Sequence, residues 1–271
     1  QWQNIGEMES KGWEFEVGGD IIQTKDFTWT SNLNLTHYTG KILTLDGSST
    51  YKNGNGFPAP GSPGDAARIE AGSEIGSFYI WKFAGFDENG DFLLYNRNGE
   101  VIPADDKVEA DKQYIGNYIP KLMLGWNNTF RYKNFDLNVS MRSWLKFDIY
   151  NQINMYFGIQ GIDECNVLKD AYGKFNEIRG EKQLCDYYLE DGSFLKIDAI
   201  TLGYSLNLKK YTNNLVDRLR IYGTVGNVCT ITGYSGINPE VDITSWDQGT
   251  EKFDGIYPQV RTYTLGLQVT F

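Results

Sequence analysis

The end of the chain, residues 262–271, alternates between apolar and polar side chains without a break. A β-strand directs successive side chains to opposite faces, so this segment has one apolar face and one small or polar face. A soluble sheet buries such a face against a core, whereas a transmembrane barrel needs it on every strand. The apolar face is formed by Tyr263, Leu265, Leu267, Val269 and Phe271.

The same alternation recurs along the chain and predicts seven long strands. Each of them holds at least 11 residues, whereas the strands of soluble sheets average about 5–6. A strand that crosses a hydrocarbon layer at a tilt needs about 9–11 residues, so these segments are long enough to do so. The predicted strands lie near residues 13–23, 27–38, 118–130, 135–149, 193–208, 218–231 and 257–271.

The connections between these strands alternate in length. Short polar turns lie at residues 24–26, 131–134 and 209–217, and long segments rich in Gly, Asp and Asn lie at residues 39–117, 150–192 and 232–256. Short turns at one rim and long loops at the other are typical of outer-membrane barrels, in which the short turns are periplasmic. The pattern therefore predicts an all-β fold, an antiparallel transmembrane β-barrel segment with long extracellular loops.

A secreted β-sandwich, such as a glycan-binding module, is the alternative. A sandwich also alternates apolar and polar positions, because its outer faces meet solvent. Strand length and the asymmetry of the loops favour the barrel. Single-chain bacterial barrels have an even number of strands, and lipid does not tolerate an open edge. We therefore expect residues 1–271 to be the C-terminal part of a larger barrel domain, interrupted in an extracellular loop.

Composition narrows the range of partners. The chain has 25 Lys and Arg against 35 Asp and Glu, a net charge of −10, which argues against a nucleic-acid partner and against a polybasic contact with anionic lipid. The mean hydropathy is −0.43, and no window holds the roughly 20 apolar residues of a membrane helix. Barrel strands escape this criterion, because only half of their residues are apolar.

Catalytic chemistry finds little support in the sequence. His37 is the only histidine, and the chain has no nucleophile elbow, zinc-protease helix motif or P-loop. A β-rich hydrolase would need paired carboxylates in a cleft. Glu14 and Glu16 share a strand face, but on a predicted barrel they suit a polar channel wall better. We expect no enzyme activity and no cofactor.

Acidic loop segments raise the question of bound calcium. Residues 87–91 resemble the start of a calcium loop, but an EF-hand needs Gly at its sixth position and Glu at its twelfth. Here Gly90 is fourth and Asn98 is twelfth, so Asn89-Gly90 is predicted to be a hairpin tip. Five other acids lie on the predicted loop rim, where they would either bind calcium or form a solvated acidic surface. They are Asp163, Glu164, Asp186, Glu190 and Asp191.

Three cysteines leave one question open. Cys165 and Cys185 would bridge one loop in an oxidising compartment, and free thiols are equally compatible with the sequence.

Aromatic residues in the long loops are the candidates for ligand contact, because sugar rings stack on aromatic faces. Packing within the loops is the alternative for each of them. The aromatic residues on the strands, namely Trp13, Trp29, Trp126 and Tyr263, are assigned to the membrane-interface belts. The ligand-contact candidates are Tyr79, Trp81, Tyr95, Tyr234 and Trp246.

Five stretches resemble the SusC/RagA-type family of TonB-dependent outer-membrane transporters. The first holds an Asn-x-Gly-Glu entry into a strand, and the others include Phe-Ala-Gly-Phe and Ile-Gly-Asn-Tyr-Ile-Pro. They run in the order of the family from one end of the chain to the other. They are residues 4–17, 83–91, 115–120, 191–204 and 226–240.

The resemblance implies a 22-stranded barrel in the bacterial outer membrane and TonB-dependent uptake of oligosaccharides or peptides. It implies several partners: the remaining N-terminal barrel and plug, which are absent from this chain, a SusD-like surface lipoprotein, the TonB complex acting through the plug, and the lipid bilayer. The closing strand with its terminal Phe271 resembles the family's barrel assembly signal, carried by Tyr263, Leu265, Leu267, Val269 and Phe271.

Overall fold

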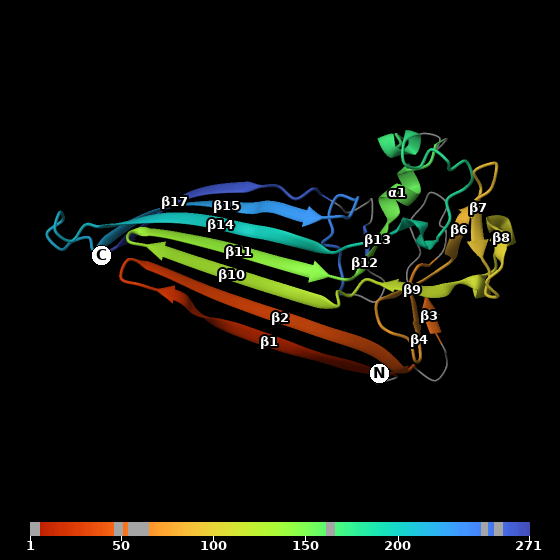
Figure 1. Cartoon of the computed structure of the whole chain (residues 1–271), viewed down its shortest axis with the longest axis horizontal. Coiled ribbons are helices and arrows are strands. Elements are labelled where there is room, and N and C mark those ends of the chain that lie inside the picture. Colours follow the sequence, from red (N-terminus) through yellow and green to blue (C-terminus); the bar gives the residue numbers. More distant parts are fainter. Residues whose placement is uncertain (1–5, 46–50, 54–64, 161–165, 245–248, 252–256) are drawn as a thin grey trace, which may run out of the picture.

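The chain forms a long sheet with a smaller folded body at one end (Figure 1). The computed structural model describes residues 6–45, 51–53, 65–160, 166–244, 249–251 and 257–271. We call the smaller body the cap. It consists of the described residues between 45 and 121, between 146 and 192, and between 233 and 251. Within the described residues, no helix has the length and apolar character that a membrane crossing demands.

Seven antiparallel strands make up the long sheet, and each pairs with the next one in chain order. The predicted seven-stranded antiparallel sheet is therefore confirmed. The C-terminal end of the last strand lies at the end of the sheet away from the cap, beside the short turns (Figure 1). The strands are β1 (Glu7–Gln23), β2 (Phe27–Thr44), β10 (Leu122–Tyr132), β11 (Phe135–Leu145), β14 (Phe194–Asn207), β15 (Arg218–Thr232) and β17 (Thr262–Thr270).

The register of the sheet gathers apolar residues on one face. Phe15 lies opposite Leu35, and Leu35 lies opposite Leu124 on the following strand. At the other edge Ile221 lies opposite Leu267, whose side chain is 68% exposed. The same register places hydroxyl and amide side chains in rows on the other face. One such row crosses six strands through Thr30, Thr129, Asn138, Thr201, Thr224 and Thr264.

The ends of several strands differ from the prediction. β10 begins at Leu122 and β11 ends at Leu145, because the flanking residues 118–121 and 147–149 turn into the cap. Tyr118 is fully buried there, and Phe147 is nearly so. The early strands are longer than predicted, with β1 beginning at Glu7 and β2 ending at Thr44.

The last strand begins later than predicted, at Thr262 and not at residue 257. β15 bulges at Asn227, whose φ is 53°. Beyond this bulge, side-chain hydrogen bonds replace the backbone pairing between β15 and the segment that precedes β17. The Asn227 amide donates to the Val260 carbonyl at 3.2 Å, and the Arg261 guanidinium donates to the Val228 carbonyl at 2.6 Å. Pro258 has no N–H to give to a ladder.

The cap consists of short strands and single helical turns. In the sheets, β6 pairs with β7 and β7 with β8, β5 pairs with β9, and β12 lies between β13 and β16. The strands are β3 (Tyr51–Asn53), β4 (Arg68–Glu70), β5 (Ser77–Ile80), β6 (Lys82–Phe86), β7 (Phe92–Tyr95), β8 (Val101–Pro103), β9 (Gln113–Asn117), β12 (Asp148–Asn151), β13 (Leu189–Asp191) and β16 (Thr250–Glu251). The helices are η1 (Ala104–Asp106), η2 (Glu109–Asp111), α1 (Gln152–Phe157), η3 (Lys169–Tyr172) and η4 (Asp186–Tyr188).

Aromatic residues from two different long connections share one core in the cap. Phe78 from the first connection lies 5.8 Å from Tyr118 and 6.2 Å from Tyr150, measured between ring centroids. Tyr188, from the far end of the second connection, lies 6.4 Å from Tyr150. All four side chains are almost fully buried. The long segments predicted as loops therefore form one folded body that is anchored to the end of the sheet.

Candidate binding site

Two of the predicted ligand-contact residues, Tyr79 and Trp81, lie side by side in the cap and are covered by cations of the chain itself. Tyr79 is 9% exposed and Trp81 is 6% exposed. The Arg68 guanidinium lies 3.7 Å from the centre of the Tyr79 ring, and the Lys112 ammonium lies 4.5 Å from that of Trp81. These cation–π contacts occupy the ring faces that a sugar would need. The placement favours the packing role for both residues.

Lys112 ties this cluster together from within. Its ammonium lies 3.1 Å from the Glu109 carboxylate and donates to the Asp65 carbonyl at 3.2 Å. Burial lowers the pKa of Lys112, and the hydrogen bond to Glu109 opposes that shift. The indole of Trp81 also donates to the Val108 carbonyl at 3.1 Å. Both the polar and the apolar parts of the cluster thus have partners inside the cap.

Tyr234 and Tyr95 complete the described candidates. Tyr234 is 6% exposed, and its hydroxyl donates to the Glu251 carboxylate at 2.7 Å. Burial raises the pKa of both Tyr234 and Glu251. Tyr95 is half-buried on β7, with the Lys82 ammonium 5.5 Å from its ring centre. Trp246 lies outside the described residues. The ligand-contact role of all five stays a prediction.

Of the five acids considered as calcium ligands, three lie within the described residues and accept hydrogen bonds from the chain itself. Asp163 and Glu164 lie outside the described residues. Asp186 accepts from the Phe83 N–H at 2.6 Å, and Glu190 accepts from the Ser235 hydroxyl at 2.7 Å. Asp191 accepts from the Ser193 N–H at 2.9 Å. Among the described residues, no three His, Cys, Asp or Glu side chains are grouped as metal ligands. Calcium in the loops remains a prediction.

Of the two cysteines considered for a disulfide, Cys165 and Cys185, the structure describes only Cys185. Cys185 carries a free thiol and is fully buried, and burial raises its pKa. Its suggested partner Cys165 lies outside the described residues.

The predicted turn at Asn89-Gly90 is confirmed as the tip of the β6–β7 hairpin. The Asp87 carboxylate accepts from the backbone N–H groups of Asn89, at 2.8 Å, and Asp91, at 2.9 Å. These bonds, led by the one from Asp91, hold the pKa of Asp87 below its usual range. Gly90 has a φ of 85°, in the left-handed region that glycine adopts freely.

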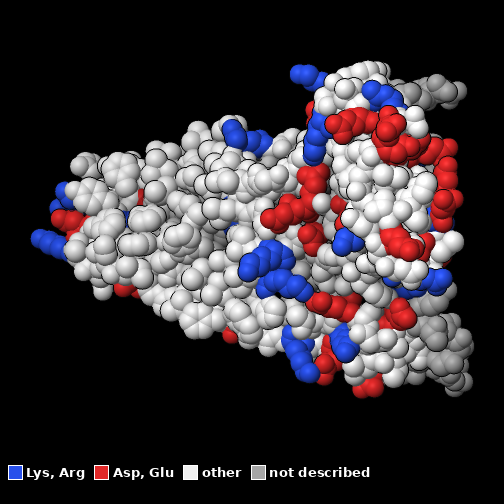
Figure 2. Space-filling view, turned by 45° about the vertical axis from the view of Figure 1, so that its right-hand side comes forward, with Lys and Arg blue, Asp and Glu red and all other residues white. Residues whose placement is uncertain are grey.

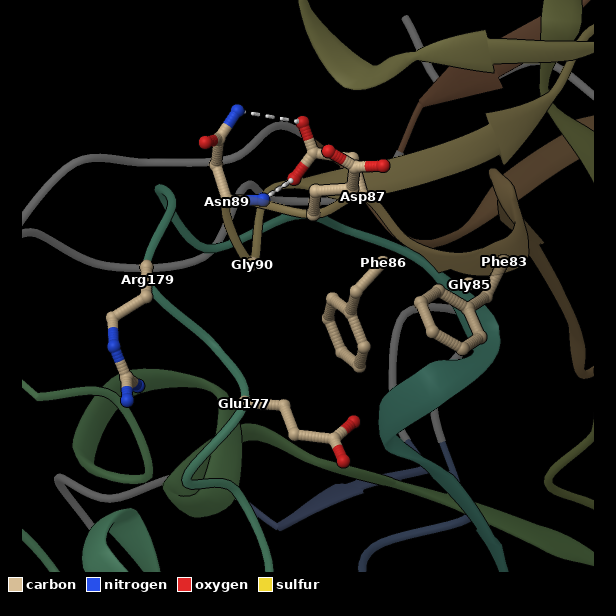
Figure 3. A pocket seen from close by; sticks show the side chains of 9 residues that line it. Phe83, Gly85, Phe86, Asp87, Asn89, Gly90, Glu177 and Arg179 are labelled. Atoms are coloured by element: carbon tan, nitrogen blue, oxygen red, sulfur yellow. Dashed lines mark hydrogen bonds between the residues drawn. The ribbon is translucent and has the colours of Figure 1, made fainter.

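An open pocket of about 640 Å³ lies between this hairpin and the segment 177–179 (Figure 3). Two half-buried rings, Phe83 and Phe86, form one side. The figure shows the Glu177 side chain reaching below the Phe86 ring from the other side. The polar lining holds three carboxylates, one amide and one guanidinium, contributed by Asp87, Glu88, Asn89, Glu177 and Arg179.

Backbone contacts fix the two sides of the pocket relative to each other. The N–H of Arg179 donates to the Gly90 carbonyl at 3.0 Å, and the N–H of Gly180 donates to the same oxygen at 3.3 Å. A Cβ at Gly90 would lie 2.3 Å from the Glu177 carbonyl oxygen, so only glycine permits this approach. The sequence singled out the hairpin but not Glu177 or Arg179, because no local motif links residues so far apart.

Comparison with known proteins shows which family the chain resembles. No family model matches the chain. SusC of Bacteroides thetaiotaomicron is 31% identical to it over 285 residues, which are 99% of this chain and 27% of SusC. TonB-dependent receptor P3 of Formosa agariphila is 28% identical over 305 residues, which cover all of this chain and 29% of that receptor. Over its whole length, the chain is similar to the SusC/RagA-type TonB-dependent receptors.

Solved structures of this family show the same fold. The structure of the RagAB peptide transporter superposes with a TM-score of 0.81 at 23% identity and covers all of this chain and 30% of that one. The predicted all-β, antiparallel barrel segment is thereby confirmed. The chain spans less than a third of the length of these relatives.

At its cap end, the polar face of the sheet carries an ion-pair network. Lys196, only 3% exposed, pairs with Glu240, which also pairs with Arg142. The Arg142 guanidinium lies 3.0 Å from the Asp198 carboxylate. Glu240 belongs to the last long connection, so the network ties that connection to the polar face of β11 and β14.

Charged side chains are distributed unevenly between the sheet and the cap. Figure 2 shows few charged side chains over the sheet, whereas acidic and basic residues gather on the cap. The exposed apolar residues on the sheet include Phe15, Leu202 and Leu265, at 53%, 54% and 81% exposure.

Proposed function

We propose that the protein containing this chain imports oligosaccharides or peptides across a bacterial outer membrane, with energy from TonB. One observation carries the proposal: a single exposed apolar face continues across all seven strands, and the opposite face is polar. Such a sheet matches a wall with lipid on one side and an aqueous lumen on the other. The family likeness supports TonB as the source of energy.

The partners follow from the same sheet. Within the described residues, β1 and β17 each have a neighbour on one side only. Lipid does not tolerate open edges, so we propose that the remaining barrel strands of the protein complete the wall. An N-terminal plug, the TonB complex and a SusD-like surface lipoprotein complete the assembly in this proposal. The names SusC and RagAB support that assembly through the likeness to those proteins.

Transport without chemical change of the cargo fits the residues. The one histidine, His37, lies on the apolar face of the sheet, with its ring 5.8 Å from that of Trp13. Its Nδ1 lies 2.6 Å from the Lys121 carbonyl oxygen. These contacts give His37 a place at the loop end of the apolar face and no catalytic neighbour among the described residues.

Uptake measurements test the proposal. The gene for the full-length protein is deleted and restored in the source bacterium, and uptake of labelled oligosaccharides and labelled peptides is compared with that of a TonB-deficient strain. We expect one of the two cargo classes to enter only when both the protein and TonB are present. Uptake that is unchanged by the deletion for every cargo contradicts the proposal.

Fractionation provides an independent check on location. We expect the full-length protein in the outer membrane, together with a co-purifying surface lipoprotein that mass spectrometry identifies. The alternative, a secreted glycan-binding module, predicts the protein in the culture medium and no detergent requirement. Recovery from the medium as a soluble monomer would favour that alternative.

A further inference from the structure

We propose that the pocket between the β6–β7 hairpin and the segment 177–179 binds an ammonium group on the cargo. A basic peptide and an amino sugar both carry such a group, so the inference concerns this shared chemistry. It rests on the proposed import function and narrows the class of cargo.

The aromatic side of the pocket is fixed before any ligand arrives. The rings of Phe83 and Phe86 meet edge to face, with their centroids 5.0 Å apart. Phe92 lies 5.8 Å from Phe83 and 5.0 Å from Phe86, and Tyr187 contacts both rings from the cap core. Aromatic faces carry negative potential and attract cations, ammonium groups among them.

The charged side of the pocket is acidic. Asp87, Glu88 and Glu177 face a single positive residue, Arg179. The Arg179 guanidinium donates from Nη1 to the carbonyl oxygens of Asn176 and Ile178, which ties that end of the group to its own segment. Among the described residues, no hydrogen bond or ion pair engages the Glu177 carboxylate. That carboxylate is therefore available to a ligand.

An ammonium group gains from both sides of this pocket at once. It meets the ring faces of Phe83 and Phe86 and the carboxylate of Glu177, which Figure 3 shows reaching below the Phe86 ring. An anionic ligand would be repelled by three carboxylates. A neutral sugar would stack on the rings but gain nothing from the net negative charge. The pocket thus distinguishes amines from their acylated counterparts.

The geometry requires little rearrangement on binding. The backbone bonds from Arg179 and Gly180 to the Gly90 carbonyl hold the two sides together. The Asp87 carboxylate stabilises the hairpin tip through Asn89 and Asp91. A site whose groups are held in place loses less entropy when a ligand binds.

Calorimetry with the purified full-length receptor in detergent tests the inference. The probes are trilysine and chitotriose, each compared with its fully N-acetylated form, at low and at high salt concentration. We expect the amines to bind and the acetylated forms to bind more weakly. We also expect added salt to weaken the amines selectively, because it screens exposed charges.

A variant and a matched control locate the binding. Glu177→Gln removes one exposed charge and should weaken the binding of an amine about two- to fivefold. Glu181→Gln removes an equally exposed carboxylate outside the pocket, four residues along the chain, and should leave binding unchanged. Glu88→Gln, on the opposite side of the pocket, should reproduce the effect of Glu177→Gln.

Equal binding of the amines and their acetylated forms would overturn the inference, as would equal effects of Glu177→Gln and Glu181→Gln. Preference for only one of trilysine and chitotriose supports the site and identifies which source of the ammonium group it accepts. The outcome is independent of the uptake test. Binding that persists without TonB-dependent uptake would refute the import function alone, and uptake without amine preference would refute this site alone.

Discussion

At the scale of single residues, glycines on the polar face make room for long side chains that lie across the sheet. Gly203 lies between Asp136 on β11 and Tyr222 on β15 in the register. The Arg220 guanidinium reaches over Gly203 and donates from Nε to Asp136 at 2.9 Å. A Cβ at Gly203 would lie 2.5 Å from the Asp136 carboxylate and 2.6 Å from the Arg220 guanidinium.

Gly203→Ala is therefore expected to destabilise the folded barrel by about 1–3 kcal/mol, because the added methyl group would displace the ion pair between Arg220 and Asp136. Urea unfolding of the full-length protein in detergent or vesicles measures the change. Gly223→Ala, on the apolar face of the neighbouring strand, is a control without a bridge, since its Cβ would meet only the Thr264 carbonyl, at 4.0 Å. Equal losses for both variants would show that the cost does not come from the bridge.

The local stability of the cap is expected to depend on pH because of Glu251. Its side chain is fully buried, and burial raises its pKa above the ordinary value of 4.5. Between that value and the higher folded-state pKa, the folded cap binds more protons than the unfolded cap. Local stability should therefore fall as pH rises through this window.

Hydrogen exchange of the Tyr234–Asn238 amides, corrected for intrinsic rates, measures this dependence. We expect protection in the wild-type protein to decrease as the pH rises above 4.5, the ordinary pKa of a glutamate. Glu251→Gln should flatten the profile. It should also lower protection at every pH, since the carboxylate accepts from the Tyr234 hydroxyl and the Asn238 N–H at two different oxygens and an amide has only one. A rise in protection with pH would contradict the argument.

At the scale of elements, the strands could be predicted because their signal is local. A period of two over a dozen residues needs no knowledge of the partner strand, and the register then follows from keeping one face apolar. The hairpin tip at Asn89-Gly90 was predictable for the same reason, since its residue types demand a turn. The strand ends were less predictable. Tyr118 and Phe147 continue the apolar pattern, but tertiary contacts draw them into the cap.

The cap and its pocket depend on contacts between residues far apart in the chain. Phe78 and Tyr150 pack together across about 70 residues, and no local period links them. Tyr79 and Trp81 were sensible ligand candidates by type, yet cations from other segments cover them. The one part of the pocket that the sequence singled out was the turn at Asn89-Gly90.

The closing strand provides a prediction at this scale. Leu267→Arg places a charge on the apolar face of β17 and should cost about 2–4 kcal/mol near the midplane of the membrane. The matched control Thr264→Arg places the same charge on the polar face, opposite the uncharged Thr224, where no lipid has to be displaced. Yield of folded full-length barrel in the outer membrane and its unfolding free energy measure both. Equal effects would mean that the two faces do not differ in environment.

At the scale of the whole molecule, the sheet and the cap have opposite surfaces. The sheet offers apolar side chains to its surroundings, and the cap buries its aromatic residues and exposes charge (Figure 2). A body in water would be expected to bury the sheet face, and a body in lipid would not retain the charged cap. Both surfaces fit the proposed membrane wall, in which only the apolar face of the sheet meets lipid and the cap extends into water.

This division predicts the behaviour of the chain on its own. Produced without detergent, the 271 residues should aggregate, because the apolar face is exposed and the ladder groups of β1 and β17 lack neighbours on one side within the described chain. Size-exclusion chromatography with light scattering measures this with and without detergent. The full-length protein in detergent is the control and should be monodisperse. A monodisperse monomer of the isolated chain in plain buffer would refute the membrane-wall assignment and revive the soluble β-rich module.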